Sequence, residues 1–156
     1  MVKIENILGF VLVLSLACSC SMTKYVPEGD HLLNKVVINT DNKKVASSDL
    51  IEYVQQQPNK SWTFLGRVSL RVYSLSGRDT SKWRNRMLRK MGEDPVIYRP
   101  YLMKDTETQL ARRMQNLGYL NAKVTEDTEF RNKKAKVIYR IETGTQYTIR
   151  NFKMGI

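Results

Sequence analysis

The chain has little of what most enzymes and metalloproteins are built from. Its 156 residues include two cysteines and one histidine, His31. Both cysteines, Cys18 and Cys20, lie near the N-terminus, so the rest of the chain has no thiol for a metal or redox site. The sequence also has no glycine-rich phosphate loop and no nucleophile–base motif. These absences predict a non-enzyme without metal, cofactor or small-molecule substrate.

The chain also has no apolar run long enough to cross a bilayer, which takes about 20 residues. Its longest run, residues 7–17, follows Lys3 and ends in small residues. This pattern is typical of a secretory signal peptide. Because the run ends at cysteine, it also suggests a bacterial lipoprotein, in which that cysteine carries an N-terminal lipid such as palmitate. We predict lipidation of Cys20, with Cys18 as the alternative; an ordinary signal peptide cut near Ala17 is the other interpretation.

Acidic residues are few. There are 15 Asp and Glu against 26 Lys and Arg, which gives a net charge of +11. A charge of this size favours acidic partners. For an exported protein, phospholipid headgroups, lipopolysaccharide or acidic protein surfaces are expected, not nucleic acid. The alternative is a basic face that is only solvated.

Hydrophobic periodicity predicts an α+β domain. β-Branched residues favour a strand at 32–40, and two more strands at 120–130 and 135–143 flank a turn at residues 131–134. In the last strand, Val137, Tyr139 and Ile141 alternate toward one face. We expect a small three-stranded sheet covered on one face by helices.

The remaining segments are expected to be mostly helical. Ser47 or Ser48 can cap a short helix, whose shared face would be Leu50, Ile51 and Val54. Residues 62–75 fit a helix or a strand, and we favour a helix. Residues 106–109 have the spacing of a capping box and predict a helix that begins there and ends at Gly118, burying Leu110, Ala111, Met114 and Leu117.

A helix opened by Asp79 or Thr80 and closed by Gly92 is strongly amphipathic. Its apolar face would consist of Trp83, Met87, Leu88 and Met91. Its other positions include Lys82, Arg84, Arg86, Arg89 and Lys90, without an acid. Such a helix can lie on an anionic membrane surface. Alternatively, Trp83 and the methionines pack on the domain and the cations are solvated, which is the interpretation we favour.

Two motifs carry a family resemblance. Residues 116–124 contain Gly118, Tyr119, Ala122 and Val124, the pattern G-Y-x-x-A-x-V. Residues 141–152 contain Gly144, Tyr147 and Ile149, the pattern G-x-x-Y-x-I. Both patterns resemble those of POTRA domains, which form the periplasmic arms of BamA/TamA-type outer-membrane assembly factors. In such a fold, Gly118 can leave its helix with positive φ.

Two further segments resemble the TamA-like lipoproteins of Bacteroidetes, often called TamL. Residues 20–29 resemble their lipidated start, which favours Cys20 over Cys18, and residues 92–98 resemble their G-E-x-P-V-I motif. The resemblance implies a signal peptide at 1–19, a tether at 20–31 and a POTRA-like domain at 32–145 with a helical insertion at about 60–92. Residues 146–156 would begin a second POTRA domain. Since that family continues into a membrane β-barrel, the chain is expected to be a truncated N-terminal portion.

The resemblance also implies a function. POTRA domains bind unfolded outer-membrane proteins or subunits of the assembly machinery, in the periplasm. A lipid would anchor this arm to the outer membrane. An exposed sheet edge, strand 120–130 or strand 33–40, can accept an extended segment as an added strand. The edge is otherwise covered or stacks on a further domain. The alternative function is a stand-alone structural or adhesive lipoprotein with a POTRA-like fold.

Overall fold

The computed structural model describes residues 22–61 and 67–148, which belong to two compact units. The sheet unit comprises residues 29–58 and 96–148, and the helical unit comprises residues 22–28, 59–61 and 67–95. Several predictions concern residues outside the described ranges: the signal peptide, Cys18, Cys20, Ile149 and the first part of the expected helix, residues 62–66.

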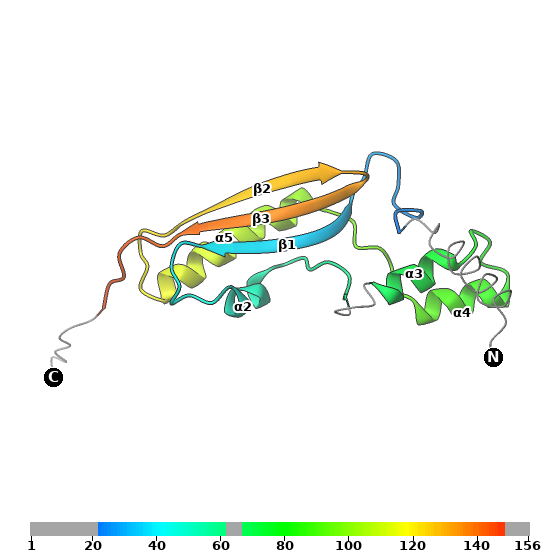
Figure 1. Cartoon of the computed structure of the whole chain (residues 1–156), viewed down its shortest axis with the longest axis horizontal. Coiled ribbons are helices and arrows are strands. Elements are labelled where there is room, and N and C mark those ends of the chain that lie inside the picture. Colours follow the sequence, from blue (N-terminus) through cyan, green and yellow to red (C-terminus); the bar gives the residue numbers. More distant parts are fainter. Residues whose placement is uncertain (1–21, 62–66, 149–156) are drawn as a thin grey trace, which may run out of the picture. The chain divides into compact units, whose positions relative to one another are not determined.

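The sheet unit is built on three strands, β1 (Leu32–Thr40), β2 (Lys123–Arg131) and β3 (Lys134–Glu142). Their order is β1-β3-β2, so β3 is central (Figure 1). β1 pairs with β3 in parallel, and β2 pairs with β3 antiparallel. The α+β fold with a small three-stranded sheet is therefore as the sequence predicts.

The turn between β2 and β3 sets their register. Asn132 and Lys133 both have positive φ, 50° and 57°. Two consecutive left-handed residues make a two-residue hairpin whose twist matches that of the strands. As a result Val124 lies opposite Ile141 and Thr128 lies opposite Val137.

The long helix α5 (Pro100–Asn116) lies along one face of the sheet (Figure 1). It begins at Pro100, a residue suited to a first helical turn because it has no amide hydrogen to leave unpaired. The predicted start at Thr106 is wrong. Thr106 lies buried within the helix, where its hydroxyl donates to the Leu102 carbonyl (2.8 Å) and accepts from the Gln55 amide (3.0 Å).

The predicted cap of the short helix is also wrong. The helix consists of α2 (Ser47–Leu50) and the 3₁₀ turn η1 (Ile51–Tyr53), and its N-cap is Ala46. The Ser47 hydroxyl instead donates to the Ile38 carbonyl of β1 (2.9 Å). Leu50 and Val54 are buried, but Ile51 is exposed because the chain tightens into the 3₁₀ turn.

The hydrophobic core of the sheet unit fills the space between the sheet, α5 and α2. Its buried members come from all three strands, from α2 and α5, and from adjoining loops: Leu33, Ile38, Val45, Leu50, Val54, Met103, Leu110, Met114, Tyr119, Val124, Val137, Tyr139 and Ile141. Full burial of one such side chain contributes about 1.5–3 kcal/mol. Apolar burial is therefore the main stabilising term of this unit.

The helical unit contains α3 (Val68–Leu75) and α4 (Trp83–Met91). The preference for a helix is thus confirmed over residues 68–75. α4 starts at Trp83, with Lys82 as its N-cap, rather than at Asp79 or Thr80. None of the helices formed by the described residues combines the length and apolarity that crossing a membrane requires.

Gly92 ends α4, and the structure shows why this residue is a glycine. Its φ of −88° is open to any residue. However, a Cβ at this position would lie 2.6 Å from the backbone nitrogen of Tyr73 in α3. Gly92 therefore permits a close approach of two backbone segments in the helical unit.

Candidate functional site

The two outer strands of the sheet differ in how much of their free edge is used. At the start of β1, the Leu33 amide donates to the Val96 carbonyl (2.7 Å), and the Tyr98 amide donates to the His31 carbonyl (2.8 Å). Farther along, the Ile38 carbonyl accepts the Ser47 hydroxyl. Neighbouring segments therefore occupy the start of the outer edge of β1 and one carbonyl farther along it.

The outer edge of β2 is open. In a two-residue hairpin, the residues that flank the turn exchange backbone hydrogen bonds, and successive residues alternate from there. The backbone groups of Val124, Glu126, Thr128 and Phe130 consequently point away from β3. No other segment in the described part of the chain donates to or accepts from them. We call these four residues the β2 edge.

Acidic side chains surround the β2 edge, although the protein as a whole is basic. Asp127 pairs with Arg140 (3.1 Å) and Glu129 pairs with Lys136 (3.0 Å) across the exposed face of the sheet. Glu126, on the other face, accepts the Thr128 hydroxyl (2.7 Å). Charged side chains on an edge strand disfavour unspecific sheet-to-sheet aggregation. The edge thus offers its backbone without offering a large apolar surface.

An aromatic cluster lies at the hairpin end of the β2 edge. The ring of Phe130 is 4.5 Å from that of His31 and 5.4 Å from that of Tyr98, measured between centroids. Phe130 nevertheless remains half exposed. An added strand could therefore pack an apolar side chain on this ring at one end of its contact.

The two sequence motifs meet in space. Gly118 has a φ of 87°, and its carbonyl accepts the Tyr147 amide (2.8 Å). A Cβ on Gly118 would lie 2.5 Å from the Tyr147 carbonyl oxygen, so both φ and space require glycine there. The side-chain amide of Asn121 also donates to the Tyr147 hydroxyl (3.3 Å). These contacts hold the segment that leaves β3 against the end of α5.

The other motif residues lie around the same junction. Tyr119 and Val124 are buried in the core, and Ala122 packs against it. The Tyr119 hydroxyl accepts the side-chain amide of Asn42 (3.0 Å). Gly144 has a φ of 66°, where the chain turns away from β3. The motif residues within the described ranges therefore build the domain and its exit, not a reactive centre.

Sequence reasoning did not single out Asp41. The Asp41 carboxylate accepts the Thr143 amide (3.1 Å) and the Thr143 hydroxyl (2.9 Å), and thereby ties the end of β1 to the end of β3. An aspartate directly after a strand is a frequent acceptor for nearby amides. This general preference could have marked Asp41 as an acceptor. The sequence does not show that its partner is Thr143, which is distant along the chain.

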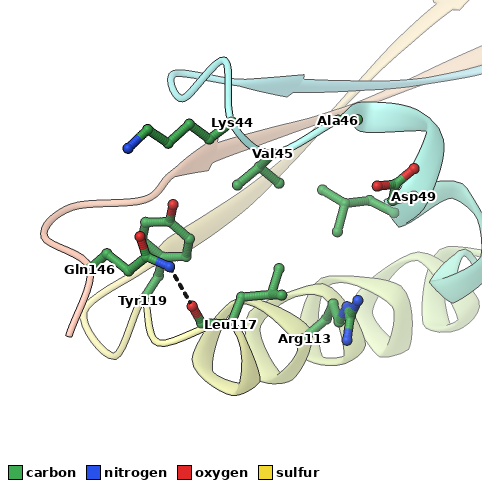
Figure 2. Close-up of a pocket in the computed structure, with 9 residues that line it drawn as sticks. Lys44, Val45, Ala46, Asp49, Arg113, Leu117, Tyr119 and Gln146 are labelled. Carbon is green, nitrogen blue, oxygen red and sulfur yellow. Dashed lines mark hydrogen bonds between the residues drawn. The ribbon is translucent and has the colours of Figure 1, made fainter. Parts of the chain in front are cut away.

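A cavity of about 190 Å³ lies between the start of α2 and the end of α5 (Figure 2). Lys44, Asp49 and Arg113 contribute charge of both signs to its lining. The Arg113 guanidinium lies 5.3 Å from the centroid of the Tyr53 ring, and its Nε has no hydrogen-bond partner among the described residues. The cavity is smaller than the ~300–1,000 Å³ typical of small-molecule sites.

The buried hydroxyl of Tyr139 is bonded within the core of the sheet unit. Burial raises the pKa of the Tyr139 hydroxyl well above its usual value, so this group stays neutral. It donates to the Met103 carbonyl (3.3 Å). Within residues 22–61 and 67–148, no group of three His, Cys, Asp or Glu side chains could hold a metal ion.

The five predicted surface cations lie in or beside α4, but they are not equivalent. Arg89 donates to the Ser76 hydroxyl (3.3 Å) and to the Gly77 carbonyl (3.1 Å), so it is an internal structural group. The Lys82 ammonium nitrogen lies 4.0 Å from a carboxylate oxygen of Asp79. The remaining three, Arg84, Arg86 and Lys90, are exposed.

Comparison with known proteins gives the family. No curated protein matches the chain in sequence. The crystal structure of POTRA domains 3–5 of BamA from Haemophilus influenzae is similar with a TM-score of 0.31 and 16% identity, over 81% of this chain and 72% of that one. The family model POTRA, described as surface antigen variable number repeat, matches residues 32–144. Since this match covers most of the sequence and the whole sheet of the sheet unit, the chain belongs to the POTRA family.

Proposed function

We propose that this chain is a protein-binding POTRA arm of an outer-membrane assembly factor, which captures extended protein segments as an added strand on the β2 edge. One observation carries the proposal: none of the outward backbone groups of β2 has a partner in the described chain, whereas on β1 the Leu33 amide and the Ile38 carbonyl are already bonded. Membership of the POTRA family supports the same role.

The chemistry of the β2 edge suits an unfolded membrane-protein client. Backbone hydrogen bonds give affinity with little demand on sequence, and each contributes about 0.5–1.5 kcal/mol net. The acids beside the edge, Glu126, Asp127 and Glu129, would disfavour acidic segments. Client segments that are neutral or basic and alternate apolar with polar residues are therefore expected.

The proposal includes a lipid anchor on Cys20, as in TamA-like lipoproteins, which would hold the arm at the periplasmic side of the outer membrane. The sequence pattern around Cys20 supports it, because an apolar run ends in small residues and cysteine there. Mass spectrometry of the mature protein from its native host tests it. An acylated N-terminus at Cys20 is expected, and an unmodified N-terminus would contradict the anchor.

A proline at Thr128 tests strand addition directly. The Thr128 amide points away from β3, so Thr128→Pro removes an outward donor without breaking the β2–β3 ladder. Thr128→Val is the matched control, because it loses the hydroxyl but keeps the amide. The probe is a urea-unfolded outer-membrane β-barrel protein, diluted into buffer with the ¹⁵N-labelled chain. Amide resonances report both binding and fold.

Thr128→Val should bind like the wild type, whereas Thr128→Pro should bind about two- to ten-fold more weakly, as expected when one net hydrogen bond is lost. In the wild type, the amides of Val124, Glu126 and Phe130 should gain protection from hydrogen exchange on binding. If Thr128→Pro keeps its fold and binds like the wild type, the β2 edge is not the binding site.

A further inference from the structure

Helix α4 buries one polar side chain and exposes three of its large apolar ones. Asn85 is buried, whereas Trp83, Met87 and Met91 are exposed to 69%, 44% and 68% of their surface. These three side chains share one face because they follow each other at four-residue spacing, and Asn85 lies on the opposite face. Within the helical unit, Trp83 and these two methionines therefore do not pack inward.

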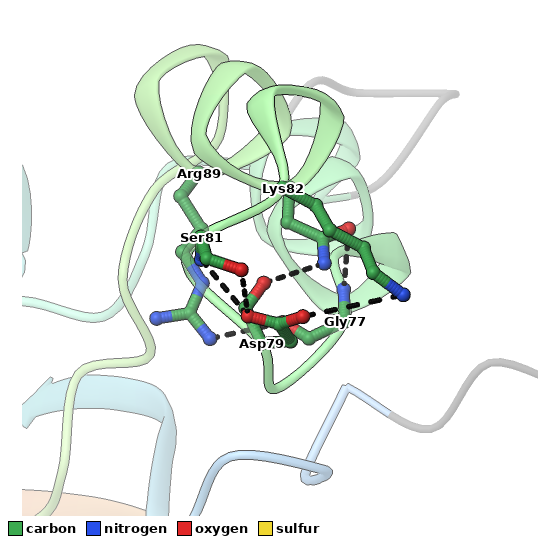
Figure 3. A network of polar contacts seen from close by, with 6 residues as sticks. Gly77, Asp79, Ser81, Lys82 and Arg89 are labelled. Atoms are coloured by element: carbon green, nitrogen blue, oxygen red, sulfur yellow. Dashed lines mark hydrogen bonds and ion pairs between the residues drawn. The ribbon is translucent and has the colours of Figure 1, made fainter.

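A polar network fixes this orientation (Figure 3). The Asn85 side chain accepts the Gly77 amide (3.0 Å) and donates to the Asp79 carbonyl (2.7 Å). Gly77 allows the contact, because a Cβ there would lie 2.6 Å from the Asn85 nitrogen. Arg89, one turn farther along, donates to Ser76 and Gly77. Rotating α4 to bury Trp83 would break all of these bonds.

The outward face of α4 is also strongly basic. The helix contains four cations and no acid. Arg89 is engaged internally, but Arg84, Arg86 and Lys90 are exposed beside the apolar stripe. Lys82 adds a further exposed cation, partly offset by Asp79. We call Trp83, Met87, Met91 and the cations Arg84, Arg86 and Lys90 the α4 face.

The helical unit also contains the segment that follows Cys20. The Lys24 ammonium donates to the carbonyls of Ser74 (3.2 Å) and Ser76 (2.9 Å). The Tyr25 hydroxyl donates to the Ser76 carbonyl, and its ring packs edge-on against Tyr73. Since Lys24 is four residues after Cys20, it lies at most about 14 Å of chain from it.

We propose that the α4 face docks on an anionic lipid surface. Tryptophan and methionine enter the interfacial layer, and flanking cations contact anionic headgroups, which is the chemistry of interfacial helices. The polar network holds α4 with this face outward, whereas an isolated short helix would have no fixed orientation. If Cys20 carries a lipid, as proposed above, the short connection would also raise the local concentration of membrane near this face. The charge and exposure of α4 support docking without that anchor.

Vesicle co-flotation of the full chain tests the docking. Cys18→Ser/Cys20→Ser removes both lipid acceptors, and this background is used for all variants. The vesicles consist of phosphatidylcholine alone or of equal parts phosphatidylcholine and phosphatidylglycerol. Binding should require phosphatidylglycerol and fall as salt is raised. Each cation near an anionic surface contributes about five-fold in partitioning, so Arg84→Glu/Arg86→Glu should bind at least about 25-fold more weakly.

A matched charge reversal in the sheet unit is the control. Lys43→Glu/Arg112→Glu changes the net charge equally at two exposed positions outside α4, and it should retain more binding than Arg84→Glu/Arg86→Glu. Circular dichroism checks that both variants are folded. Equal binding by the two variants, or no binding of the parent at low salt, would overturn the proposal.

Trp83 fluorescence identifies what covers the face. In a Trp62→Phe background, Trp83 emission should shift to the blue only with anionic vesicles, and brominated lipids should quench it. A blue shift that depends on protein concentration without vesicles would mean that a second copy covers α4, and it would overturn docking on lipid.

Discussion

The two units of this chain differ in the side chains that they bury. The sheet unit buries apolar side chains from its three strands and from α2 and α5, and its sheet carries charge pairs on the exposed face. The helical unit buries Asn85, Ser74 and Ser76, and exposes Leu75, Trp83 and Met91. Among the described residues, the buried side chains of the first unit are mostly apolar, whereas the second unit buries Val26 and Leu70 together with more polar than apolar side chains.

This difference separates two kinds of surface. The sheet unit exposes backbone groups along the β2 edge, and charged side chains lie beside them. The helical unit presents apolar side chains that its own polar contacts keep outward. Substitutions should therefore have different consequences in the two units, and three variants test this.

The largest loss of stability is expected when a core side chain of the sheet unit is truncated. Leu110 on α5 is fully buried in the core, so Leu110→Ala should lower the free energy of unfolding by about 2–5 kcal/mol. Urea denaturation followed by circular dichroism measures it. Met91→Ala, which truncates an exposed side chain of α4, is the control and should change stability by less than about 0.5 kcal/mol. Similar losses for the two variants would contradict the comparison.

A smaller loss of stability is expected from Asn85→Leu in the helical unit, although this change makes a buried side chain more apolar. In an apolar core such a change adds favourable burial, but here it leaves the Gly77 amide and the Asp79 carbonyl without partners. The loss should be about 1–3 kcal/mol. Hydrogen exchange of the amides in α3 and α4 measures it locally. Amides of β3 serve as the internal control and should be unchanged; a gain in protection of α4 would show that apolar burial suffices there.

The sequence predicted the sheet unit better than the helical unit for a physical reason. The strands follow from local alternation of β-branched residues, and all three lie close to the expected ranges. The start of α5 was missed because Thr106, the expected cap, bonds to Gln55, which is distant in sequence. The same holds for Ser47, whose hydroxyl is used by Ile38 of β1.

The candidate surfaces were even less accessible to sequence reasoning. Both outer strands were candidates for the open edge, and only the contacts of Val96, Tyr98 and Ser47 with the β1 side distinguish them. For α4, amphipathicity identified the right face but not its direction. The direction depends on Asn85 and its partners in the preceding turn, and a helical pattern does not contain this information.

The smallest effect on stability is expected from Trp83→Gln, and this variant most sharply separates stability from surface function. Trp83 has a largely exposed side chain, so the free energy of unfolding should change by less than about 0.5 kcal/mol. Vesicle binding should nevertheless weaken, because the indole supplies much of the apolar area of the α4 face. Parallel urea denaturation and co-flotation measure the two quantities. A stability loss as large as that of Leu110→Ala would mean that Trp83 packs inside the protein, and the helical unit would then resemble the sheet unit after all.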